Sequence, residues 1–137
     1  MFFIIETRLP SLNEVIKDNR SGWQVASKRK REIEETIGYY IMAARRRGTI
    51  RPTDDPVVIE INWHESTRKR DVDNIQSAQK FILDALQKQG ILINDNRKYV
   101  KQIYHHIFDS DKDYVEVILR NASESNETVP IPLLKRI

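Results

Sequence analysis

Two carboxylates one residue apart, Asp71 and Asp73, are the residues best suited to chemistry in this chain. They follow three cations, Arg68–Arg70, and precede a helical pattern that runs from Asn74 to about Gln89. If Asp71 ends an extended segment and Asp73 caps the helix, both carboxylates converge on one small volume. Like charges at such a short distance repel each other, and a hard cation such as Mg²⁺ relieves the repulsion. The spacing therefore indicates a metal site, although solvated turn acids show it too.

The helical pattern has one apolar face and one polar face. The apolar stripe comprises Ile75, Ala78, Ile82, Ala85 and Leu86. On one continuous helix, Lys80 lies within about 40° of Asp73 and could reach a phosphate. An exposed Lys80–Asp84 ion pair explains the same spacing and is favoured by spacing alone. Ser77 occupies the same polar face and lies nearer to Asp73.

The order of motifs resembles that of the RusA-type Holliday-junction resolvases over about residues 7–100. The matching residues are Pro10–Asn13, Arg70–Asn74, Lys80, Leu83–Leu86, Gly90 and Asn94–Asp95. The resemblance implies catalytic carboxylates at Asp71, Asp73 and Asp95 and a functional lysine at Lys80. The chain departs from the family in a spacer before Lys80 that is longer by about one helical turn. It also has Asn94 in place of an acid.

The resemblance implies a Mg²⁺-dependent endodeoxyribonuclease, with Mn²⁺ as a substitute metal, that resolves four-way DNA junctions in recombination and repair. Asp71, Asp73 and Asp95 would bind one or two metal ions, and Lys80 would neutralise charge on the phosphate. The products would carry 5′-phosphate and 3′-hydroxyl ends. Two symmetric cuts imply a C2 homodimer. A non-catalytic nucleic-acid-binding protein and a nuclease for flaps or single strands are the alternatives.

The distribution of charge favours a nucleic-acid partner. The 137-residue chain has a net charge of +3, with cations clustered at Lys28–Arg31, Arg45–Arg47 and Arg68–Arg70. Such runs are usually solvated, but three of them, one beside paired acids, favour a polyanion. The candidate DNA contacts are Asn13, Lys17, Arg20, Arg68, Lys69, Arg70, Asn74 and Ser77. Trp23 either touches DNA or covers the core, and the second role is favoured.

Composition excludes several classes of protein. The chain has no cysteine, so it has neither a disulfide framework nor a Cys-ligated zinc site. No apolar run approaches the ~20 residues needed to span a bilayer. Met1–Ile5 is too short for a signal peptide and lacks a basic start. We therefore expect a cytoplasmic protein without membrane association and, as no phosphate-binding glycine loop is present, without an organic cofactor.

The expected fold is α+β, a two-layer sandwich of two helices on a four-stranded mixed sheet in the order β-α-β-α-β-β. Strands are expected over Phe2–Leu9, Val57–His64, Lys98–Phe108 and Tyr114–Arg120, and helices over Ser27–Arg47 and Asn74–Gln89. Residues 10–24 are expected to be an irregular connection, and the last two strands a hairpin around Asp109–Asp113. Residues 1–120 would form the endonuclease domain and residues 121–137 a C-terminal tail or dimer arm.

Histidines and acids within the strands are the remaining candidates. Glu60 is either a fourth carboxylate of the site or part of a strand face that is polar on one side. His105 and His106 are adjacent in a strand and point to opposite faces, so they cannot bind one metal together. Ordinary sheet histidines are the favoured interpretation.

Overall fold

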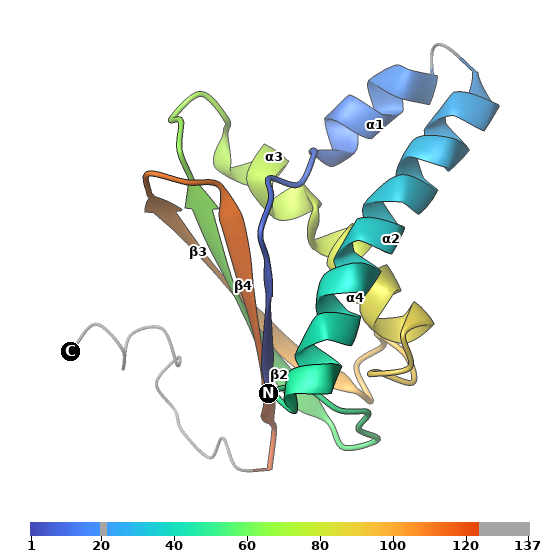
Figure 1. The fold of residues 1–137 in the computed structure, drawn as a ribbon, viewed down its shortest axis with the longest axis vertical. Helices are drawn as coiled ribbons and strands as arrows, with labels where there is room; N and C mark the ends of the chain where they lie inside the picture. Colours follow the sequence, from blue (N-terminus) through green and yellow to red (C-terminus); the bar gives the residue numbers. More distant parts are fainter. Residues whose placement is uncertain (20–21, 124–137) are drawn as a thin grey trace.

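A four-stranded mixed sheet with helices on one side forms the fold in a computed structural model of the protein (Figure 1). The structure describes residues 1–19 and 22–123. The strands are β1 (Phe2–Ile5), β2 (Val57–Glu65), β3 (Val100–Asp109) and β4 (Tyr114–Asn121). The helices are α1 (Leu12–Asn19), α2 (Trp23–Arg47), α3 (Val72–Ser77) and α4 (Gln79–Lys88). The α+β class and the mixed four-stranded sheet are confirmed.

The central strand β2 organises the sheet, whose strand order is β1-β4-β2-β3. It pairs in parallel with β3 and antiparallel with β4. Its side chains are buried from Val57 to Trp63, including the polar residue Glu60. Glu60 lies opposite Tyr104 on one neighbouring strand and Ile118 on the other, and these large side chains flank it. Glu60 and Asn62, on the polar face of this strand, are therefore both buried.

Strands β3 and β4 are consecutive in the chain but do not pair with each other. Ile61 of β2 lies opposite His105 of β3 and Val117 of β4, so β2 separates the two strands. The hairpin expected around Asp109–Asp113 is therefore wrong. The physical reason is that β2, the most buried strand, satisfies its backbone hydrogen-bonding groups only with a neighbour on both edges.

Helix α1 occupies part of the segment that was expected to be irregular. Ser11 Oγ accepts the Glu14 N–H at 3.1 Å and so caps the helix. Val15 is buried and anchors the helix on the core. The spacing Ser11-x-x-Glu14 is that of a capping box, and this local signal outweighs the polar composition of residues 10–24.

The single helix expected over Asn74–Gln89 is divided at Ala78 into α3 and α4. Ser77 Oγ donates to the Asn74 carbonyl at 2.7 Å and accepts the Leu12 N–H at 3.0 Å. A hydroxyl bonded to a carbonyl of the preceding turn competes with the regular helical ladder. The chain therefore changes direction at Ala78. At the far end, Gly90 adopts a φ of 72°, which fits the stop expected there.

The C-terminal arm expected over residues 121–137 lies almost entirely outside the described residues. β4 includes Asn121, whose side-chain amide donates to Asp55 Oδ2 at 3.2 Å. Within the described part of the chain, no helix is long and apolar enough to cross a membrane.

A chain of hydrogen bonds joins the sheet to α4 through His105. Trp63 Nε1–H donates to His105 Nδ1 at 2.9 Å, and His105 Nε2–H donates to Gln79 Oε1 at 2.7 Å. An indole N–H can only donate, so neutral His105 with its proton on Nε2 satisfies both contacts. Burial, with a smaller effect of the neighbouring His106, lowers the pKa of His105 below its ordinary 6.5.

This contact predicts a loss of stability in acid. The unfolded chain binds a proton at His105 more readily than the folded protein does, so the free energy of unfolding falls as the pH drops below 6.5. Urea unfolding between about pH 7.5 and about pH 5 measures the effect. In His105→Gln, which keeps a donor and an acceptor, this part of the pH dependence should disappear. An identical pH dependence in both proteins would contradict the assignment.

Candidate functional site

The paired acids lie at the start of α3, where the chain leaves the C-terminal end of β2. Asp71 is the N-cap residue, with φ −71° and ψ 154°, and Asp73 lies in the first helical turn. The expectation that Asp73 caps the helix is thus wrong by two positions. The Asp71 side chain makes no capping hydrogen bond, and both residues are exposed. Two acids of one short segment are therefore presented to solvent at one end of the sheet.

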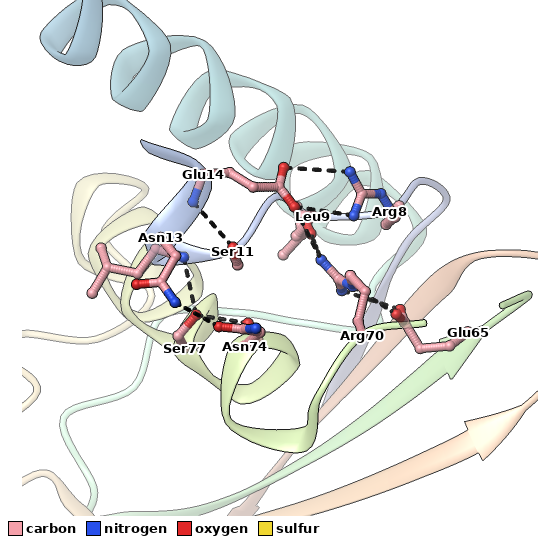
Figure 2. Close-up of polar contacts among 10 residues, drawn as sticks. Arg8, Leu9, Ser11, Asn13, Glu14, Glu65, Arg70, Asn74 and Ser77 are labelled. Carbon is pink, nitrogen blue, oxygen red and sulfur yellow. Dashed lines mark hydrogen bonds and ion pairs between the residues drawn. The ribbon is translucent and has the colours of Figure 1, made fainter. Parts of the chain in front are cut away.

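The segment Leu9–Asn13, which follows β1, docks against α3 (Figure 2). Asn13 Nδ2–H donates to Asn74 Oδ1 at 2.7 Å, and the Leu12 N–H donates to Ser77 Oγ at 3.0 Å. These contacts join residues that are 61 and 65 positions apart in the chain. The segments that carry two of the matching motifs, Pro10–Asn13 and Arg70–Asn74, therefore form one continuous surface beside the acid pair.

Arg70 fixes this surface to the sheet (Figure 2). Its guanidinium donates to both carboxylate oxygens of Glu65, at 2.8 and 3.3 Å, and to the Leu9 carbonyl at 2.9 Å. The side chains of Arg70 and Glu65 are only 11% and 4% exposed. A bidentate pair of this kind fixes orientation as well as charge. Because Arg70 immediately precedes Asp71, the pair sets the position of the acids relative to β2.

The expected DNA contacts of Arg70, Asn13, Asn74 and Ser77 stay predictions, and the structure gives each side chain a protein partner. Arg70 also lies 3.9 Å from a carboxylate oxygen of Glu14. The Ser77 hydroxyl both donates and accepts within the protein. Arg70 and Ser77 therefore position the site, whereas Asn13 is exposed and can still meet a ligand.

Lys80 lies on α4, beyond the break at Ala78. The angle between Lys80 and Asp73 on a continuous helix therefore does not apply, and that argument for placing Lys80 beside the acids is wrong. Lys80 Nζ lies 3.8 Å from Asp84 Oδ2, so the expected ion pair is confirmed. Asp84 also lies 3.7 Å from Lys30 Nζ on α2. Lys80 thus belongs to a charged cluster between α4 and α2.

Asp95 lies at the opposite end of the sheet from Asp71. It precedes β3, and Tyr99 of the same connection accepts the N–H of Val57, the first residue of β2, at 2.8 Å. Asp71 lies beyond Glu65, the last residue of β2. The strand has nine residues, or eight steps of about 3.3 Å, so its two ends are on the order of 25 Å apart. The chain thus brings the first two acids together and leaves Asp95 at the other end of the strand.

The remaining expected cations are exposed or lie outside the described residues. Arg68 and Lys69 are exposed in the connection before α3, and Arg68 lies 3.2 Å from Asp109 at the end of β3. Lys17 is exposed on α1. Arg20 lies outside the described residues. Throughout residues 1–19 and 22–123, no group of three or more histidines or acids could hold a metal ion.

Two features of the site were not expected from the sequence. Glu65, the last residue of β2, was not singled out from the sequence, although an arginine five residues later offers it a partner. Trp23 is 72% exposed at the start of α2, so the expectation that it covers the core is wrong. The buried stripe of α2 begins only at Ala26, one turn later.

No protein-family model matches the chain, and no curated protein matches its sequence. The function proposed for the chain therefore rests on its own residues and on the contacts among them.

The Arg70–Glu65 pair predicts a strong and specific effect on stability. Arg70→Ala leaves a buried carboxylate without its cation, so the free energy of unfolding should fall by about 3 kcal/mol or more. Arg68→Ala is the matched control, because Arg68 and its partner Asp109 are 85% and 63% exposed. Loss of such an exposed pair should cost less than about 1 kcal/mol. Equal effects of the two substitutions in urea unfolding would contradict the anchoring role.

Proposed function

We propose that this protein is a Mg²⁺-dependent, structure-selective endodeoxyribonuclease of the RusA type, which resolves four-way DNA junctions. The docking of Leu9–Asn13 onto α3 carries the proposal. The two segments that bear the early and central motifs of the resemblance meet through Asn13 and Asn74, and they do so beside the acid pair. If these segments were solvated turns without a common function, they would not be expected to pack against each other in this way.

Asp71 and Asp73 fit a hard divalent cation. Both offer carboxylate oxygens to solvent, and the helix does not use the Asp71 carboxylate as a cap. When bound, Mg²⁺ would activate water and neutralise charge on the scissile phosphate. Arg68 and Lys69, in the connection that leads to the acids, would attract the DNA backbone. Asn13 would contact the strand from the docked segment.

A third carboxylate would come from a second copy of the chain. Within one copy, Asp95 and Asp71 lie beyond opposite ends of β2, and these ends are on the order of 25 Å apart. In a C2 dimer with antiparallel subunits, the Asp71 end of one copy lies beside the Asp95 end of the other. We therefore propose a homodimer with two composite sites, one for each of the paired cuts.

Lys80 keeps its proposed role of neutralising charge on the phosphate. Its exposed ammonium, on the helix that follows α3, is available to a bound strand. A nuclease for flaps or single strands would use the same residues, and a non-catalytic DNA-binding protein would use the cations alone. Cleavage of a synthetic four-way junction, with and without Mg²⁺ or Mn²⁺, separates these functions.

The acids should be needed for cutting but not for binding. Asp71→Asn, Asp73→Asn and Asp95→Asn should each abolish junction cleavage, because each removes a metal ligand. Binding should persist or tighten, because each substitution removes a negative charge that faces phosphate. Single-turnover cleavage and gel shift measure the two properties separately.

The control neutralises an acid elsewhere. Glu35 is exposed on α2, and Glu35→Gln should cut at the parent rate. Near-parent cleavage by any two of the three aspartate variants would refute the site. A parent protein that binds the junction but never cuts it would indicate the non-catalytic alternative.

A further inference from the structure

A groove of about 910 Å³ lies between the first half of α2 and α4. The two helices run side by side in the same direction (Figure 1). Lys30 of α2 lies 3.7 Å from Asp84 of α4, and one turn further along both helices Glu34 lies 2.7 Å from Lys88. The groove therefore follows the two helix axes.

Trp23 lines this groove at the first turn of α2. Its side chain is 72% exposed, which is unusual for the largest apolar side chain. The other tryptophan, Trp63, is fully buried. Gln24 and Ser27 line the groove beside Trp23 and offer hydrogen-bonding groups. An exposed indole among polar side chains presents a flat face on which a planar ring can stack.

The lining of the groove has an excess of positive charge. Its cations are Lys30, Arg31, Lys80 and Lys88, and its acids are Glu34 and Asp84. Glu34 is buried and accepts a hydrogen bond from Lys88, and this bond raises the pKa of Lys88 above its ordinary value. Glu34 and Asp84 also lie within 3.8 Å of Lys30. The acids thus hold the lysines in place along the groove, so less conformational freedom is lost when an anion binds.

We propose that this groove binds an unpaired segment of a nucleic-acid strand, with a base stacked on Trp23 and phosphates against Lys30 and Arg31. A row of cations with an aromatic stacking surface is the combination that single strands require. The choice of nucleic acid among polyanions rests on the proposed nuclease function.

The groove begins close to the proposed cleavage site. Lys80 lines its α4 side and follows Asp73 by only seven residues of the chain, across the break at Ala78. The groove would therefore take the part of a junction strand that has left its duplex beside the scissile phosphate.

Binding of a fluorescently labelled oligothymidine of about ten nucleotides, in EDTA and with the full-length protein, tests the proposal. Trp23→Ala should weaken binding roughly 5- to 100-fold, and Trp23→Phe should retain most of the affinity. The oligonucleotide should also quench the tryptophan fluorescence of the parent protein but not that of Trp23→Ala, because Trp63 is buried. Folding of each variant is checked by its far-UV spectrum.

Tyr39→Ala is the matched control. Tyr39 is an equally exposed aromatic residue of α2, at 68%, and lies about 160° around the helix from Trp23. This variant should bind the oligonucleotide as the parent does. Unchanged affinity in Trp23→Ala would overturn the proposal. Equal quenching by polyglutamate would also overturn it, in favour of an acidic protein partner.

These readouts are separate from the proposed nuclease activity, because they are made without metal. Binding through Trp23 by a protein that never cuts a junction would support the groove and refute the nuclease. Junction cleavage at the parent rate by Trp23→Ala, with unchanged oligonucleotide affinity, would support the nuclease and refute the groove.

Discussion

The buried ion pair between Arg70 and Glu65 is the constraint on which the rest of the site depends. It joins the end of the central strand to the residue before Asp71, and the same guanidinium holds the Leu9 carbonyl. A buried pair of this kind adds little net stability, but loss of one partner is costly. Its role is therefore geometric. It sets the acid pair, the docked segment after β1 and the end of β2 in one arrangement.

The second constraint is the parallel pairing of β2 with β3. This pairing places the connection before β3 at the start of β2, whereas Asp71 lies beyond its end. The acids that the resemblance groups together are thus divided between two ends of one sheet. In the proposed dimer, a symmetric pair of chains would bring them together, and the proposed substrate would have the same two-fold symmetry.

The sequence predicted the four strands and the long helix, because their apolar periodicity is strong. The first strand ends at Ile5 and not at Leu9, and the long helix begins at Trp23 and not at Ser27. The prediction from sequence failed where contacts between distant residues determine the local structure. The hairpin was wrong because β2 inserts between β3 and β4, which no local pattern reveals. The single helix was wrong because Ser77 bonds to Leu12, 65 residues away. The acids Asp71 and Asp73 were found by type and spacing, but the anchoring of Arg70 and the exposure of Trp23 depend on packing.

The most direct test mixes two inactive variants, Asp71→Asn and Asp95→Asn, and follows nicking of a four-way junction in Mg²⁺. With composite sites, a mixed dimer has one site that carries both substitutions and one that carries neither. Random exchange makes about half of the dimers mixed, so about a quarter of the parent's sites should be restored. We predict that mixing returns activity as single nicks. A mixture as inactive as its components would contradict the account.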